Sequence, residues 1–159
     1  MSVEQRVAEL GLEFPPEPLL PNGVRVPFEW VRIVGERCVL SGHGALGADG
    51  APAGPFGRVP SEVPLEAAQQ SARAAMLAML GALRSTLGSL DRIRDWVSLS
   101  GFVNADPGYP HTTAVLNAAS DLLLEVFGEN GRHARTAIGV AALPLNLPVV
   151  ISAELVVTP

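Results

Sequence analysis

The stretch PLEAAQQSARAAMLAMLGALRSTLG, residues 64–88, decides the fold class because it has the periodicity of a long amphipathic helix. Pro64 suits a first helical turn, Glu66 favours the positive end of the helix dipole, and Gly88 stands where a C-terminal cap belongs. We therefore expect a helix over 64–87, whose many alanines allow close packing on a sheet. Its apolar stripe consists of Ala68, Ala72, Met76, Leu80, Leu83 and Leu87.

The segments on either side of this helix alternate between strand and helix patterns. Two further helices are expected over 2–10 and 112–127. The expected strands are 24–34, 37–41, 95–104, 136–142 and 149–157. The order β-β-(β)-α-β-α-β-β predicts an α/β (α+β) fold in which two long helices cover one face of a mixed sheet. We expect the other face to be apolar and covered by a second copy of the chain.

The chain is expected to form a single domain over residues 1–159. Residues 1–22 hold the short helix and a proline-rich arm, since four prolines between 14 and 21 break regular structure. Residues 42–60 are dense in glycine and proline and predict a loop. A loop of this length in a compact domain tends to mark function or a lid.

Composition excludes several classes of function. All 11 basic residues are arginine, so lysine-anchored pyridoxal phosphate, Schiff-base chemistry and a phosphate-binding loop with its lysine are ruled out. No glycine-rich dinucleotide motif occurs, and the three histidines are far apart, so we expect no cofactor and no metal. The net charge of −5 and the absence of a basic run argue against nucleic acid as a partner.

The single cysteine, Cys38, cannot form an internal disulfide and fits a reducing compartment. The N-terminus does not resemble a signal peptide, and no stretch approaches the ~18 apolar residues of a membrane helix. We therefore expect a cytoplasmic protein with no membrane partner. Hydrophobic residues make up 48% of this short chain, which favours an oligomer.

One segment, RHARTAIGVAALPL at 132–145, carries the most specific signal, because Arg135 opens an otherwise apolar strand. A buried guanidinium without a partner is costly. From the residues alone, a salt bridge to an acidic side chain or a solvated strand end is the favoured interpretation.

The pattern Arg-Thr-Ala-Ile-Gly-Val-Ala-x-Leu-Pro-Leu at 135–145 resembles the C-terminal signature of the YjgF/RidA superfamily, also described as endoribonuclease L-PSP-like proteins. Supporting matches are Leu-Ser-Gly at 40–42, Gly-Phe-Val-Asn at 101–104 and the helix segment from 117 to 128. The resemblance runs from about residue 28 to 157, and the opening helix fits a long-form branch. It implies a chorismate-mutase-like fold and a homotrimer with a cleft between neighbouring subunits.

In that family the arginine matching Arg135 grips the carboxylate of small ligands, a bidentate task that suits a planar guanidinium. Arg135 is therefore the candidate catalytic residue. Phe28 stands where the family has a tyrosine, so the hydroxyl is missing here. Further candidate binding residues implied by the resemblance are Ser41, Gly42, Asn117, Ala137 and Val150.

The last strand departs from the family pattern. Deaminase members read Pro-Val-Glu-Val-Glu-Ala, and their first glutamate helps to position the hydrolytic water. Here Val150 and Ser152 replace the two glutamates, and Glu154 lies ~13 Å along the strand from Val150. A valine can neither accept a proton nor orient water.

We therefore expect a RidA-like protein that binds small carboxylates, 2-oxo or 2-imino acids, with weak or no hydrolysis of 2-imino acids to 2-oxo acids and ammonia. The alternative is an active 2-iminobutanoate/2-iminopropanoate deaminase. An endoribonuclease or translation inhibitor follows from the family label alone, and the acidic charge balance disfavours it.

Overall fold

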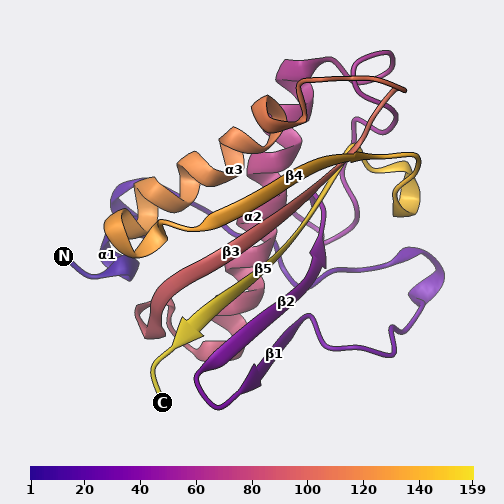
Figure 1. Cartoon of the computed structure of the whole chain (residues 1–159). Helices are drawn as coiled ribbons and strands as arrows, with labels where there is room; N and C mark the ends of the chain where they lie inside the picture. Colours follow the sequence, from indigo (N-terminus) through magenta and orange to yellow (C-terminus); the bar gives the residue numbers. More distant parts are fainter.

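A single five-stranded sheet forms the centre of the computed structural model, which describes residues 1–159 (Figure 1). The spatial order is β1-β2-β5-β3-β4, and every neighbouring pair is antiparallel except β3 and β4. That pair is parallel because a helix, α3, makes the crossover between them. The strands are β1 (Val31–Val34), β2 (Arg37–His43), β3 (Ile93–Asn104), β4 (Ala134–Val140) and β5 (Val149–Val157).

Two long helices, α2 (Leu65–Leu87) and α3 (Thr112–Phe127), pack side by side on one face of the sheet (Figure 1). Both agree with the predicted helices, and Gly88 ends α2 in the left-handed conformation with φ of 81°. Every residue of the predicted α2 stripe is buried in the core. Four one-turn 3-10 helices complete the chain: η1 (Pro21–Gly23), η2 (Leu90–Arg92), η3 (Gly128–Gly131) and η4 (Pro144–Asn146).

The face of the sheet away from the helices is not uniformly apolar, contrary to expectation. Residues of β5 alternate strictly between buried and partly exposed positions, and the partly exposed set includes Val150 and Ser152. Val150 aligns with Phe102 in β3, which aligns with Ile138 in β4. The neighbouring row consists of hydroxyl side chains: Ser152, Ser100 and Thr136. Apolar and polar rows therefore follow each other across this face.

Several boundaries differ from those predicted. The expected strand over 24–34 is reduced to Val31–Val34, because the preceding residues form an arm in which Val24 is 59% exposed and makes no ladder. The additional strand that was expected before α2, given in parentheses in the predicted order, is absent. That region contains an isolated bridge between Leu46 and Pro52. β4 begins earlier than expected, at Ala134, because pairing with Ser98 of β3 starts there.

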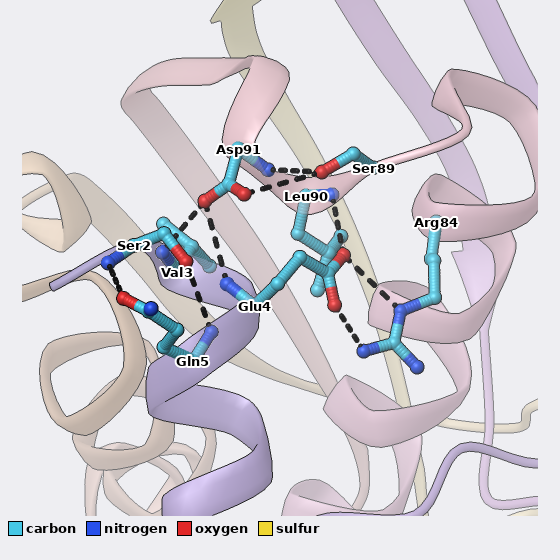
Figure 2. Close-up of polar contacts among 8 residues, drawn as sticks. All are labelled: Ser2, Val3, Glu4, Gln5, Arg84, Ser89, Leu90 and Asp91. Atoms are coloured by element: carbon cyan, nitrogen blue, oxygen red, sulfur yellow. Dashed lines mark hydrogen bonds and ion pairs between the residues drawn. The ribbon is translucent and has the colours of Figure 1, made fainter.

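The N-terminal helix α1 (Val3–Glu9) is fixed by polar contacts to the C-terminal end of α2 and to η2 (Figure 2). Asp91 Oδ1 accepts hydrogen bonds from the backbone N–H groups of Val3 and Glu4 at 2.7 and 3.3 Å. Glu4 in turn forms an ion pair with Arg84 and accepts the N–H of Leu90 at 2.8 Å. The arm that follows α1 therefore starts from a fixed point. None of the helices combines the length and apolar character required to cross a bilayer.

Candidate functional site

Arg135 lies on β4 with its guanidinium against α3. Its Nη1 donates to Ser120 Oγ at 3.0 Å, and its Nη2 donates to Asn117 Oδ1 at 2.9 Å and to the Thr113 carbonyl at 3.3 Å. Thr113, Asn117 and Ser120 share one face of α3 because they are spaced by about one helical turn. Arg135 forms no ion pair with an acidic side chain of its own chain. The salt bridge favoured by the residues alone is therefore absent.

Behind Arg135, Ser120 and His133 continue the chain of hydrogen bonds. His133 Nδ1 lies 2.7 Å from the Gly131 carbonyl, and its Nε2 lies 2.9 Å from Ser120 Oγ. Because a carbonyl only accepts, Nδ1 carries a proton, and in the tautomer with its single proton there Nε2 accepts the Ser120 hydroxyl. The lone pairs of Ser120 Oγ are then free to accept from Arg135. His133 thus orients the hydroxyl that holds the guanidinium.

Ala137 lies two residues beyond Arg135 on the same side of β4, since side chains alternate along a strand. Its carbonyl accepts a hydrogen bond from Thr112 Oγ1 at 3.0 Å, which ties β4 to the start of α3. Arg135, Asn117 and Ala137 therefore form one group at the β4 edge of the sheet.

Phe28, Gly42 and Val150 form a second group, which lines a pocket of about 590 Å³ where β2 ends and β5 begins. A Cβ on Gly42 would lie 2.9 Å from Val150 Cγ1, so only glycine allows this approach without movement of the valine. Ser41 does not line the pocket. Its Oγ donates to the Glu29 carbonyl at 2.7 Å and thereby fixes the segment that carries Phe28.

The two groups do not meet within one chain. β4 is an edge strand, and β3 and β5 lie between it and β2. Three strand spacings correspond to about 14 Å. Arg135 also lies on the helix-covered side of its strand, whereas Val150 lies on the opposite face of the sheet. A single copy therefore brings together only part of the predicted set.

No acidic side chain lines the pocket, and the nearest glutamate along β5 is engaged elsewhere. Glu154 accepts two hydrogen bonds from Arg37, at 2.7 and 3.2 Å. These hydrogen bonds from Arg37 lower the pKa of the Glu154 carboxyl, so that it stays ionised and paired. The pocket lining around Val150 therefore contains no carboxylate of this chain.

His43 is the one titratable side chain of the pocket lining. Its ring is 2% exposed, and burial lowers its pKa despite the opposing effect of the Ser41 carbonyl at Nδ1, 2.7 Å away. The ring is therefore neutral around pH 7, and the pocket carries no charge of its own.

Ser120 and His133 were not predicted as site residues, although signals for both exist in the sequence. His133 is two residues before Arg135, so strand alternation places the two on the same side. Ser120 is one helical turn beyond Asn117. The apolar arm residues that line the pocket, Leu20 and Val24 among them, carry no such signal because an extended arm has no periodicity.

Comparison with known proteins identifies the family. The family model described as "YjgF/chorismate_mutase-like, putative endoribonuclease" matches residues 4–155. Protein TCP17 of Trypanosoma cruzi is 42% identical over 98 residues, which are 61% of this chain and 61% of that protein. The match thus spans about three fifths of the curated relative.

Solved structures agree over nearly the whole chain. Atu1372 of Agrobacterium tumefaciens, a protein of unknown function, is 31% identical with a TM-score of 0.84, covering 98% of this chain and 92% of that one. A "putative endoribonuclease" from Shewanella oneidensis is 27% identical with a TM-score of 0.88, covering 99% and 100%. These similarities confirm the family and the fold expected from the motifs. The chain belongs to the YjgF/chorismate mutase-like family.

Proposed function

We propose that this protein binds small carboxylates, 2-oxo or 2-imino acids, in clefts between the subunits of a homotrimer. Arg135 of one copy supplies the carboxylate-binding guanidinium, and the pocket around Phe28, Gly42 and Val150 of its neighbour receives the rest of the ligand. The observation that carries the proposal is the way Arg135 is held by three neutral oxygen acceptors and by no carboxylate.

The hydrogen bonds around Arg135 orient the guanidinium without neutralising it. Ser120, Asn117 and the Thr113 carbonyl use two of its nitrogens, and Nε takes part in none of these contacts. A guanidinium has five N–H donors, so at least two remain for a ligand. These are the Nε–H and one N–H of Nη1, and an external carboxylate can accept a charge-assisted hydrogen bond from either of them, which is stronger than one between neutral groups.

The separation of the two groups supports a site shared between copies. Arg135 sits at the open β4 edge, and the pocket sits toward the β1–β2 edge. In a closed ring of identical subunits, one such edge meets the opposite edge of the next copy. Each interface of the ring then contains one arginine and one pocket.

Hydrolysis of 2-imino acids by this cleft is weak or absent. Val150 offers no group to position water, and Glu154 is held by Arg37. Binding and orientation alone still accelerate a reaction that is already easy in water, but without a proton acceptor the gain is modest.

Isothermal titration calorimetry with 2-oxobutanoate tests the proposal. Arg135→Ala should weaken binding at least ~10-fold, because a charge-assisted hydrogen bond to the ligand carboxylate is removed. Arg132→Ala is the matched control, since that exposed side chain pairs with Glu129 at 2.9 Å. Equal affinity of wild type and Arg135→Ala would refute the proposal.

An ammonia-release assay with 2-iminobutanoate trapped by semicarbazide separates binding from catalysis. Rates near background are expected for wild type. A clearly accelerated rate that depends on Arg135 would instead establish the deaminase alternative.

A further inference from the structure

We infer that the pocket beside β2 and β5 receives a bulky aliphatic or aromatic substituent of the bound carboxylate, so that the preferred ligand is an amphiphilic acid rather than a two- or three-carbon acid. The inference rests on the proposed function for the carboxylate end of the ligand. It adds the chemical class of the other end.

The size and chemistry of the pocket point to an apolar group. Its volume of about 590 Å³ lies within the range of ~300–1,000 Å³ that is usual for small-molecule sites. A water molecule takes up ~30 Å³ in the liquid, so the pocket has room for far more than an ethyl group. Apart from His43, no acidic or basic side chain lines it. Most of its lining is apolar and includes Leu20, Val24, Phe28, Leu145, Leu147 and Val150.

One wall of the pocket is the N-terminal arm, which is held in place from both sides. The Phe14 ring packs beneath the Arg84 guanidinium, 4.7 Å from its centroid. A Cβ on Gly81 would come within 3.0 Å of Phe14 Cβ, so the arm lies directly on α2. Farther along, the Leu19 N–H donates to the Gly50 carbonyl at 2.8 Å. The wall is therefore formed before any ligand arrives.

A second wall of the pocket contains η4, where Leu145 and Asn146 both adopt positive φ, 59° and 56°. Such a backbone is strained for a leucine and is often found at ligand-binding positions. The turn is held by Asn146, whose carbonyl accepts the Gly57 N–H at 2.8 Å and whose Oδ1 accepts from buried Asn104 at 3.2 Å. The strained backbone thus places the Leu145 side chain, which is 46% exposed, in the pocket lining.

The long loop over 44–64 joins these two walls, through Gly50 on one side and Gly57 on the other. It therefore acts as a brace rather than as a lid. A preformed apolar pocket of this kind favours a rigid or extended hydrocarbon group, because little ordering of the protein is needed on binding. The adjoining arginine of the neighbouring copy then selects an acid.

The test is calorimetry with 2-oxobutanoate, 2-oxohexanoate and 2-oxooctanoate, which share one carboxylate and differ in chain length. Affinity should rise about fourfold per added methylene, the change that corresponds to ~0.8 kcal/mol for each buried methylene. Val24→Trp should fill the pocket and abolish this rise. Leu19→Trp is the matched control, because both side chains are 59% exposed on the arm but only Val24 lines the pocket.

The outcomes separate the two proposals. Equal affinity for all three acids, with binding still dependent on Arg135, would overturn the pocket inference and leave the proposed function standing. A rise with chain length that persists in Arg135→Ala would support the pocket and refute the proposed function. If Val24→Trp changes the oligomeric mass in light scattering and not the chain-length dependence, the pocket holds a second copy and the inference is wrong.

Discussion

Ser120→Ala should weaken carboxylate binding although Ser120 itself touches no ligand. The substitution removes the oxygen that accepts from Arg135 Nη1 at 3.0 Å and leaves His133 Nε2 without its partner. A hydrogen bond to a charged group contributes ~1.5–3 kcal/mol, and water recovers part of this at a half-exposed guanidinium. A net loss of ~1–1.4 kcal/mol corresponds to a roughly 5- to 10-fold higher Kd.

Calorimetric titration of 2-oxobutanoate into Ser120→Ala measures this effect, and two comparisons isolate its cause. Ser120→Thr keeps the hydroxyl and should restore most of the affinity. The neutral amide 2-oxobutanamide should bind wild type and Ser120→Ala equally, because it lacks the charge that Arg135 recognises. An unchanged Kd for 2-oxobutanoate in Ser120→Ala, in a protein whose Arg135→Ala variant has lost binding, would refute the positioning role.

Three further predictions concern stability and reactivity. Gly101→Ala should lower the free energy of unfolding by at least ~1–3 kcal/mol in urea titrations, because the new Cβ would lie 2.3 Å from Leu116 Cγ in the core. Burial raises the pKa of the Cys38 thiol to about 11, so Cys38 should resist iodoacetamide at pH 8 until the chain unfolds. Burial alone would raise the pKa of Glu4, but hydrogen bonds from Arg84 and Leu90 and the Arg84 charge lower it overall from 4.5. Glu4 therefore stabilises the fold at pH values above its ordinary pKa and loses this effect as the pH falls through its lowered pKa, so Glu4→Gln should cost ~1 kcal/mol or less at pH 7 and progressively less in acid.

Much of the fold could be predicted because its main elements carry strong periodic patterns. The helix over 64–87 and the one over 112–127 have continuous apolar stripes, and both were found within one residue of the expected bounds. β5 was also found as expected, over Val149–Val157. Each of these elements buries one face in the core, so the apolar pattern in the sequence coincides with the buried residues of the fold.

The segments whose secondary structure was predicted wrongly lack this agreement between local pattern and burial. Val24 and Phe28 have strand-like composition, yet they belong to an arm whose apolar side chains line a pocket instead of pairing in the sheet. The start of β4 at Ala134 depends on its partner in β3, which no local pattern reveals.

The candidate site was predictable in its residues and not in its arrangement. The motif around Arg135 marks the arginine, but the sequence gives no sign that Asn117 lies with it while Gly42 and Val150 lie elsewhere. That division depends on strand order, β1-β2-β5-β3-β4, which is a property of the whole sheet.

Complementation between two defective variants tests the shared site most directly. Arg135→Ala lacks the guanidinium, and Gly42→Leu blocks the pocket, so neither alone should bind 2-oxobutanoate. When equal amounts are unfolded and refolded together, about a quarter of the interfaces in a cyclic oligomer should combine an intact arginine with an intact pocket. We predict a binding stoichiometry near that fraction of wild type, and no recovery in the mixture would contradict a site built from two copies.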